Sequence, residues 1–82
     1  MERVIKIGKT YRHFKGNKYK VLDIVYDSEA SDDKEYRMVV IYQALYGDML
    51  KWARPYEIFN SKVDHEKYPD VKQKYRFEEV DE

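Results

Sequence analysis

The sequence predicts a small domain that is mainly β. Three observations support this fold class. The chain has 82 residues, which is enough for one hydrophobic core, and it contains no internal repeat. Aromatic residues, nine of them tyrosines, make up 16% of the chain, and such residues favour strands. The apolar residues alternate or form short runs rather than recurring every three to four positions, which indicates strands rather than helices.

The first two strands are expected to form a hairpin. Residues 9–14 are the first strand and residues 19–27 the second, and Gly16 supplies the positive φ that a two-residue type II′ turn needs. Side chains on the second strand alternate between its two faces. We expect the buried face to carry Leu22, Ile24 and Tyr26.

The third and fourth strands are expected to follow a long exposed loop. The loop is the polar, acidic stretch 27–34, and the third strand is residues 35–46. This third strand is apolar on both faces, so we expect it to be central in the sheet. Gly47 begins a second tight turn into the fourth strand, residues 49–54, which ends at Pro55 because proline cannot donate to a ladder.

The last part of the fold is expected to be a helical turn and a closing strand. Proline suits the first position of such a turn, so residues 55–60 are expected to form it, with Ile58 and Phe59 facing inward. Residues 61–64 are then a short fifth strand. Four meander strands, a helical turn and a closing strand are typical of an SH3-like barrel, in which the first and last strands meet.

The domain is placed in residues 1–64, and residues 65–82 are treated as a charged C-terminal extension. The extension is two-thirds polar or charged and ends on four acids within five residues. Tyr75 and Phe77, which follow Pro69, suggest a short extra strand within it.

The composition indicates the cellular compartment of the protein. The chain has no cysteine, which excludes disulfides, thiolate metal sites and a cysteine nucleophile, and a secreted domain of this size usually needs disulfides. We therefore expect a cytoplasmic protein. No apolar run approaches the roughly 20 residues of a membrane span, and the first ten residues lack the apolar core of a signal peptide.

The charges are unevenly distributed although the formal net charge is zero. Residues 1–20 carry seven Lys or Arg against one acid, and residues 21–50 carry two against seven acids. The basic start could form a patch for phosphates or acidic partners, or the two stretches could lie side by side and cancel.

Three motifs resemble a known family. The runs YRHFKGNKYKVLDI, VVIYQALYGD and WARPYEIF are similar, in order and spacing, to the bacterial family called domain of unknown function 1653. The similarity covers roughly residues 8–63. It implies a compact bacterial domain, and it brings no reaction, ligand or catalytic residue. The acidic insert at 28–34 and the charged tail depart from the family pattern.

The sequence offers little catalytic or metal-binding chemistry. His13 beside an acid such as Asp48 could act as a general base, but none of the serines or Thr10 sits in a strained glycine elbow that would make it a nucleophile. His13 and His65 lack the spacing of metal ligands, and the acidic loop lacks the glycine and final acid of a calcium loop. We expect no enzyme activity, no metal and no cofactor.

The aromatic residues are the more informative candidates. If Ile41 and Leu45 fill the barrel together with the Leu22 face, three tyrosines and Trp52 lie on an outer face and could hold a peptide or stack on bases. Alternatively, Trp52 is the core anchor and the tyrosines only pack across strands. Arg54 and Gln43 could each bind a carboxylate or phosphate. Alternatively, Arg54 pairs with Glu57 or Asp48, and Gln43 hydrogen-bonds to a turn carbonyl.

Our leading hypothesis is therefore a non-enzymatic binding module for a peptide or partner protein. The alternative is RNA or DNA binding through the basic start, with the tyrosines as stacking platforms. The candidate binding residues are Tyr11, Arg12, His13, Tyr42, Gln43, Tyr46, Trp52 and Arg54.

Overall fold

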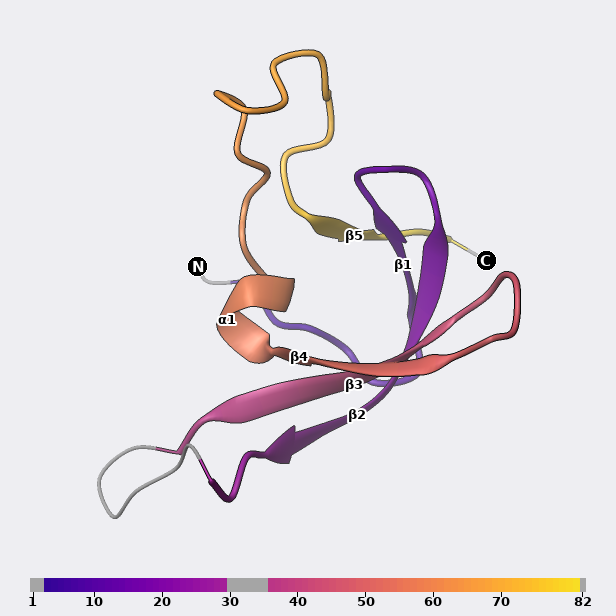
Figure 1. Ribbon diagram of the computed structural model, residues 1–82, viewed down its shortest axis with the longest axis vertical. Helices are drawn as coiled ribbons and strands as arrows, with labels where there is room; N and C mark the ends of the chain where they lie inside the picture. The colour runs from indigo at the N-terminus through magenta and orange to yellow at the C-terminus, as the bar shows by residue number, and fades with distance from the viewer. Residues whose placement is uncertain (1–2, 30–35, 82) are drawn as a thin grey trace.

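The structure is a computed structural model that describes residues 3–29 and 36–81 (Figure 1). This part of the chain forms five strands and one short helix: β1 Thr10–His13, β2 Lys18–Tyr26, β3 Met38–Ala44, β4 Lys51–Pro55, α1 Tyr56–Phe59 and β5 Phe77–Glu79. The prediction of a mainly β domain with one helical turn is confirmed. Most of the predicted acidic loop, residues 30–34, and the predicted start of the third strand at 35 lie outside the described residues.

The five strands form one antiparallel sheet in the order β4-β3-β2-β1-β5 (Figure 1). The first and last strands are neighbours, as predicted, and β3 lies inside the sheet. The two edges of the sheet are β4 and β5, and within the described residues no strand pairing joins them. The sheet is therefore not closed into a complete barrel, and we call the gap between β4 and β5 the open seam.

The closing strand lies later in the chain than predicted. Residues 61–64 form no strand, and only Lys62 makes an isolated bridge, to Tyr75. The strand that pairs with β1 is β5, where Phe77 is buried opposite His13. Burial of a large aromatic ring stabilises β5 more than Val63 alone could stabilise a strand at 61–64. The short strand suggested near Phe77 is thus present, while the division of the chain at residue 64 stays a prediction.

The β1–β2 hairpin has a three-residue loop rather than the predicted two-residue turn. The carbonyl of His13 accepts the N–H of Gly16 at 2.7 Å, and the N–H of His13 donates to the carbonyl of Asn17 at 2.8 Å. Gly16 has a φ of 108°. The predicted positive φ of Gly16 is therefore confirmed, and glycine suits this position because the left-handed conformation strains a residue with a side chain. The loop around it is one residue longer than predicted.

A bulge in β2 changes which side chains face the core. It lies between Val21 and Asp23, and Val21 is fully buried whereas Leu22 is only half-buried. Beyond the bulge Ile24 packs against the core and Tyr26 is exposed. The prediction of a buried face is therefore right for Ile24 and wrong for Leu22 and Tyr26, because one extra residue breaks the alternation on which it rested.

The core face of β3 is also the opposite of the one expected. Its buried side chains are Val40, Tyr42 and Ala44. Tyr42 lies directly opposite Val21, so both side chains are on the same face of the sheet. The prediction that Ile41 and Leu45 fill the interior is wrong, and Tyr42 lies inside rather than on an outer face.

Aromatic rings fill most of the core. Phe59 of α1 is fully buried, while Ile58 is 43% exposed, so the helical turn points only one of its two expected side chains inward. The rings of Tyr11 and Tyr42 each contact Phe59 edge-on, at 5.7 and 5.2 Å between centroids. The remaining buried members of this core cluster are Ile5, Val21, Val40 and Phe77.

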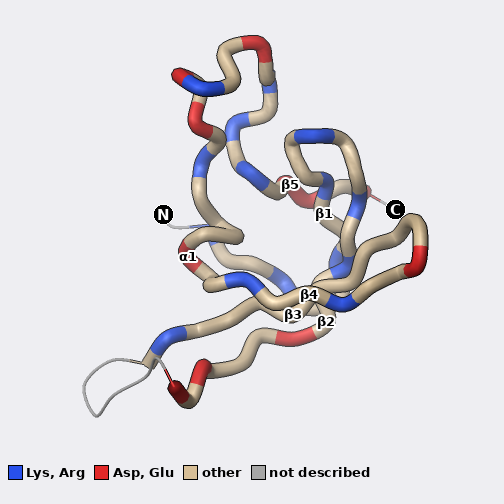
Figure 2. Tube along the Cα trace, in the orientation of Figure 1, with Lys and Arg blue, Asp and Glu red and all other residues tan. Residues whose placement is uncertain are grey.

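Along the chain trace, positions of Lys and Arg are interspersed with positions of Asp and Glu (Figure 2). The Nζ of Lys6 lies 3.3 Å from the Oε1 of Glu79, and Arg12 lies opposite Glu78 in the β1–β5 ladder. Part of the basic start is therefore matched by the acidic end of the chain. Within the described residues, no helix has the length and apolar character needed to cross a bilayer.

Candidate binding site at the open seam

The open seam gathers side chains from both edges of the sheet. Trp52 lies opposite Tyr42 and Arg54 opposite Val40, so β4 directs Trp52 and Arg54 to the inner face of the sheet. On the other edge, His13 lies opposite Phe77. Because β4 has no strand beyond it, its inward side chains reach the surface at the seam.

Arg54 and Phe77 bring the two edges into contact. The Cζ of Arg54 lies 5.5 Å from the centroid of the Phe77 ring. Burial raises the pKa of Tyr42, and the nearby positive charge of Arg54 opposes that rise. The ring of His13 packs edge-on against Phe77 at 4.9 Å. A guanidinium group above an aromatic face is attracted to the ring and keeps its charge at the surface.

Three tyrosines form the floor of the seam beside Arg54. The hydroxyls of Tyr19 and Tyr46 are 2.7 Å apart, and the ring of Tyr19 lies edge-on to Tyr42 at 5.4 Å between centroids. Burial, followed by the hydrogen bond to Tyr46, raises the pKa of Tyr19 to about 12. Sequence reasoning missed Tyr19 because it was assigned to the outward face of β2. Its position two residues before the buried Val21 was the signal available.

The rim of the seam is exposed and apolar. Trp52 is 49% exposed and Tyr46 is 44% exposed. Three further exposed apolar side chains belong to the turn between β3 and β4: Leu45, Met49 and Leu50. The alternative that Trp52 is the core anchor is wrong, because the large buried rings are those of other residues. Exposure of the only tryptophan in a chain of this size is uncommon for a residue that is usually well buried.

The backbone of β4 presents unpaired groups along the seam. The N–H of Ala44 donates to the carbonyl of Leu50 at 2.9 Å, so Ala44 and Leu50 are a hydrogen-bonded pair of the β3–β4 ladder. In an antiparallel pair the hydrogen-bonded positions alternate, so Trp52 and Arg54 bond toward β3. The N–H and carbonyl groups of Lys51 and Ala53 therefore point away from β3, along the free edge.

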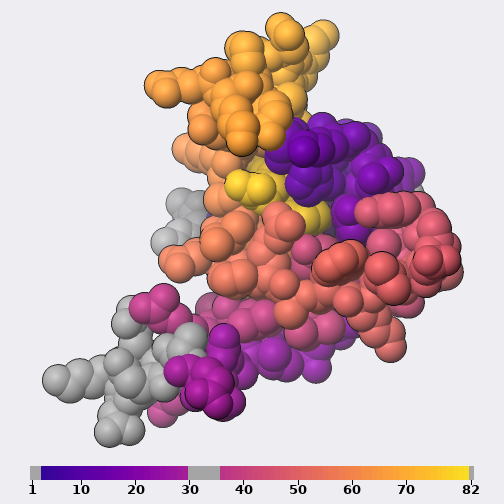
Figure 3. Space-filling model, in the orientation of Figure 1, coloured from indigo at the N-terminus to yellow at the C-terminus, as the bar shows by residue number. Residues whose placement is uncertain are grey.

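A hollow of about 340 Å³ adjoins the seam at Arg54. Figure 3 shows part of the C-terminal stretch, in yellow, between the indigo β1–β2 hairpin and the orange segment that follows α1. We call this hollow the basic hollow, because four of its eight lining residues are Lys or Arg. It is lined by His13, Phe14, Lys15, Arg54, Asp64, Lys67, Tyr68 and Arg76.

Burial and neighbouring charge keep His13 neutral. Burial comes first, and the positive charges of Arg54, Arg76 and Lys15 add to it, so that the pKa of His13 falls to about 4. Its Nδ1 accepts the backbone N–H of Lys15 at 3.1 Å, which leaves the ring proton on Nε2. Asp48, which the sequence suggested as its acidic partner, is not among the groups that shift this pKa.

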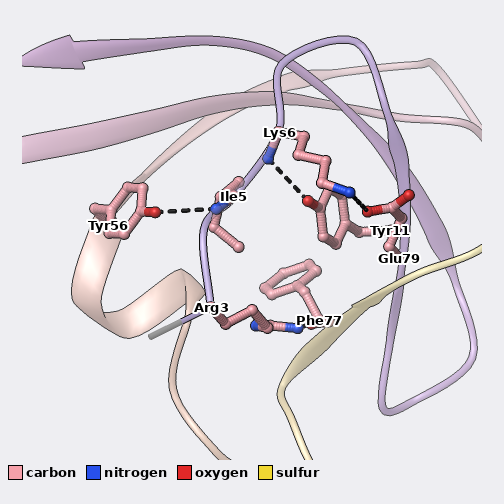
Figure 4. Close-up of polar contacts among 7 residues, drawn as sticks. All are labelled: Arg3, Ile5, Lys6, Tyr11, Tyr56, Phe77 and Glu79. Carbon is pink, nitrogen blue, oxygen red and sulfur yellow. Dashed lines mark hydrogen bonds and ion pairs between the residues drawn. The ribbon is translucent and has the colours of Figure 1, made fainter. Parts of the chain in front are cut away.

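The N-terminal segment covers the opposite end of the seam (Figure 4). The guanidinium of Arg3 donates to the carbonyl of Phe77 at 2.6 Å. The N–H of Ile5 donates to the hydroxyl of Tyr56 at 2.9 Å, and Ile5 itself is buried. Residues 3–5 therefore bridge α1 and β5, which leaves the Arg54 end of the seam as the open one.

The comparisons with known proteins give one match. The model of a family described as a protein of unknown function, DUF1653, matches residues 9–79. The chain belongs to the DUF1653 family. The matched range extends from the start of β1 to the end of β5, so it includes every strand of the sheet. No curated protein and no solved structure matches the chain.

In this DUF1653 chain the eight predicted site residues separate into three groups. Five of the eight lie at or near the open seam: His13, Tyr42, Tyr46, Trp52 and Arg54. Tyr11 is 2% exposed in the core, where its hydroxyl accepts the N–H of Lys6. The last two, Arg12 and Gln43, lie on the outer face of the sheet.

The two outer-face residues have partners of their own. Arg12 lies within 3.4 Å of the side-chain oxygen of Gln73. The side-chain amide of Gln43 donates to the carbonyl of Met49, which confirms the alternative that Gln43 satisfies a turn. Of the two partners considered for Arg54, neither Glu57 nor Asp48 forms an ion pair with it within the described residues.

A second hollow, about 470 Å³ in volume, lies between α1 and the far ends of β2 and β3. Tyr36, Met38 and Ile58 line it with exposed apolar surface. No group of three or more histidine or acidic side chains suited to a metal ion occurs among residues 3–29 and 36–81.

Proposed function

We propose that this DUF1653 chain is a non-enzymatic binding module that holds an extended segment of a partner protein along β4. One observation carries the proposal: Trp52 is half exposed on a free edge strand, with Arg54 further along the same face of β4 and the exposed Tyr46 in the turn that precedes β4. Tryptophan, tyrosine and arginine are the residue types that most often dominate the binding energy of protein interfaces.

The free edge of β4 gives the partner a backbone to pair with. An extended segment that adds as a further strand would hydrogen-bond with the outward groups of Lys51 and Ala53. Its alternate side chains would then lie on the inner face, above Trp52 and Arg54. Backbone pairing supplies affinity in such complexes, and the pockets for alternate side chains supply specificity.

The side chains near the seam support a binding role over catalysis. The Nδ1 of His13 is occupied by a backbone N–H, and its neutral ring is surrounded by cations rather than by an orienting carboxylate. The hydroxyl of Ser61, one of the candidates considered as a nucleophile, donates to the carbonyl of Ile58 at 2.6 Å. A general base needs a free nitrogen within reach of the proton that it removes.

The decisive experiment removes one backbone donor from the free edge. Ala53→Pro deletes an N–H that points away from β3, so the sheet is expected to remain while strand addition is blocked. Ala53→Thr keeps that N–H and is the matched control. Tagged wild-type chain, both Ala53 variants and Trp52→Ala are used to capture proteins from a nuclease-treated bacterial lysate, and circular dichroism checks that each is folded.

We expect one partner to be captured by the wild-type chain and by Ala53→Thr, and lost from Ala53→Pro and Trp52→Ala. If the Ala53→Pro and Trp52→Ala variants are folded and both still capture the partner, the proposal is contradicted. Peptides from the captured protein can then be titrated against the fluorescence of Trp52, the single tryptophan.

Nucleic-acid binding is the second candidate, favoured by one feature of the register. Lys20, Gln43 and Lys51 lie side by side across three strands, and Arg12 lies opposite Lys18 on the same outer face. The stacking tyrosines that this function needs, however, lie on the inner face of the sheet, and Tyr11 and Tyr42 are buried. Capture that disappears on nuclease treatment, and that weakens steeply with salt, would favour this candidate instead.

A further inference from the structure

The basic hollow concentrates positive charge from four separate parts of the chain. Lys15 belongs to the β1–β2 loop, Arg54 to β4 and Lys67 to the segment between α1 and β5, and Arg76 immediately precedes β5. Within the part of the chain that the structure describes, none of the four forms an ion pair with a carboxylate. Like charges that converge without a counter-charge repel one another, and an anion bound among them would relieve that repulsion.

The one carboxylate in the hollow is engaged by its own turn. The Oδ1 of Asp64 accepts the backbone N–H groups of Glu66 and Lys67, at 3.1 and 3.4 Å. It therefore caps a local turn, and its single negative charge faces the four positive charges of the lining residues. The hollow keeps an excess of cations over anions among its lining residues.

The polar groups in the hollow are suited to a phosphoryl group. Arg54 and Arg76 each carry a planar guanidinium, whose parallel N–H donors match the geometry of phosphate oxygens. His13 also lines the hollow, and its neutral ring carries the remaining N–H, on Nε2, as a further donor. Lys15 and Lys67 add two further positive charges to the lining, and both residues are exposed.

An aromatic wall stands beside these donors. The rings of Phe14 and Tyr68 contact each other at 5.0 Å between centroids, and the Nζ of Lys15 lies within 6 Å of both rings. Both residues are half-buried. A volume of about 340 Å³ lies at the lower end of the range for small-molecule pockets. Such a wall beside cations can stack on the base of a nucleotide.

We propose that the basic hollow binds the phosphoryl group of a small ligand of about the size of a nucleoside monophosphate. Arg54 and Arg76 hold the phosphate oxygens, His13 donates a hydrogen bond, and the Phe14–Tyr68 wall receives the base. This site shares Arg54 with the proposed partner-binding surface, but it goes beyond that proposal because it does not use the backbone edge of β4 or the ring of Trp52.

The test is a titration of the ¹⁵N-labelled full chain at constant ionic strength, followed by amide and histidine-ring NMR shifts. Three probes separate the sources of binding: inorganic phosphate, a nucleoside monophosphate, and the same nucleoside without phosphate. We expect saturable shifts at His13 and the neighbouring residues with the two phosphates. The monophosphate should bind roughly tenfold more tightly than inorganic phosphate, as stacking of one base on a ring contributes. The nucleoside alone should leave these signals unchanged.

A pair of charge variants tests where the phosphate binds. Lys15→Gln/Lys67→Gln removes two exposed cations from the hollow, whereas Lys9→Gln/Lys20→Gln removes two exposed cations elsewhere and keeps the same net charge. We expect the first double variant to weaken phosphate binding roughly tenfold or more, and the second to bind as the parent does. Both substitutions are on exposed side chains, so the fold is expected to be retained.

Two outcomes would overturn the proposal. One is the absence of saturable shifts with either phosphate. The other is an equal loss of binding in both double variants, which would show a general attraction to a basic surface. Equal affinity for inorganic phosphate and the monophosphate would support the phosphoryl site without a role for the ring wall. Because the Ala53→Pro variant leaves this hollow intact, failure here is distinguishable from failure of the strand-addition proposal.

Discussion

The ring of Phe59 lies parallel to the ring of Phe77, with centroids 4.0 Å apart and planes 4° apart. Phe59 belongs to α1, which directly follows β4, and Phe77 begins β5. The two edges of the sheet share no strand pairing, so this stack is a main contact between them. Side-chain packing thus substitutes at the seam for the hydrogen-bonded ladder of a closed barrel.

Truncation of this stack should destabilise the fold strongly. We expect Phe77→Ala to lower the free energy of unfolding by about 3–5 kcal/mol, because it removes a buried ring and leaves a cavity beside Phe59. Ile58→Ala, on the exposed side of the same helical turn, should cost less than about 1 kcal/mol. Urea denaturation measures both, and similar losses for the two variants would show that α1 is placed wrongly.

The β2 bulge makes a matched pair of substitutions diverge. Val21→Thr places a hydroxyl in the core and should cost about 1–3 kcal/mol, whereas Val25→Thr should be within about 0.5 kcal/mol of the parent. Strict alternation along β2 would put both valines on one face and predict equal effects. Chemical denaturation of the two variants therefore tests whether the bulge is present.

The pH dependence of stability should carry the signature of His13. Its pKa is about 4 in the folded chain and close to 6.5 when unfolded, so between these values the unfolded chain binds more protons. The contribution of neutral His13 to the free energy of unfolding is fully present above the unfolded pKa of about 6.5, and it is lost as the pH falls from there through about 4. Urea denaturation at several pH values measures how the free energy of unfolding depends on pH. This dependence should be less steep in the His13→Gln variant, and an equally steep one would contradict the assignment.

The Tyr19–Tyr46 hydroxyl pair should be visible in tyrosine titrations. Tyr46→Phe removes a hydrogen bond that helps to raise the pKa of Tyr19, so this pKa should fall below its value of about 12 in the wild-type chain. A ¹³C-labelled tyrosine NMR titration measures the shift. The Tyr36→Phe variant, at an exposed tyrosine elsewhere, is the control and should leave Tyr19 unchanged.

The exposure of Trp52 can be measured before any partner is known. Its fluorescence should be quenched readily by acrylamide in the folded chain, because about half of its surface is open. Trp52→Ala should change the free energy of unfolding by much less than the roughly 3–5 kcal/mol of a buried tryptophan. Poor quenching together with a large loss of stability would place Trp52 in a core and remove the rim of the proposed site.

The sequence was sufficient for the fold class and for most strands, because hydrophobic patterning and turn glycines are local properties. It failed where one residue changes the phase of a pattern. Because of the bulge after Val21, the side chains that face the core from β2 differ from those predicted. The expectation that Ile41 rather than Val40 is buried likewise put the wrong face of β3 inward. Tyr42 was therefore chosen as a surface residue although it is buried.

The site was predicted only in part for a related reason. His13, Trp52 and Arg54 were chosen for their chemistry, and they do lie at one end of the seam. Arg76 and Lys67 were not chosen, because they come from a stretch that composition marked as an extension. Their position depends on the pairing of β5 with β1, a contact between distant parts of the chain that local patterns do not encode.

The pairing of β1 with β5 also sets when the protein can finish folding. Tyr11 lies opposite Glu79 in that ladder, so β1 must wait for a strand that is synthesised much later. Contacts so distant in sequence form slowly, since the intervening chain must first be ordered. During synthesis the edge of β1 is open to neighbouring chains, and emergence of β5 from the ribosome, rather than emergence of the first hairpin, marks the point at which this sheet edge is protected from misassembly.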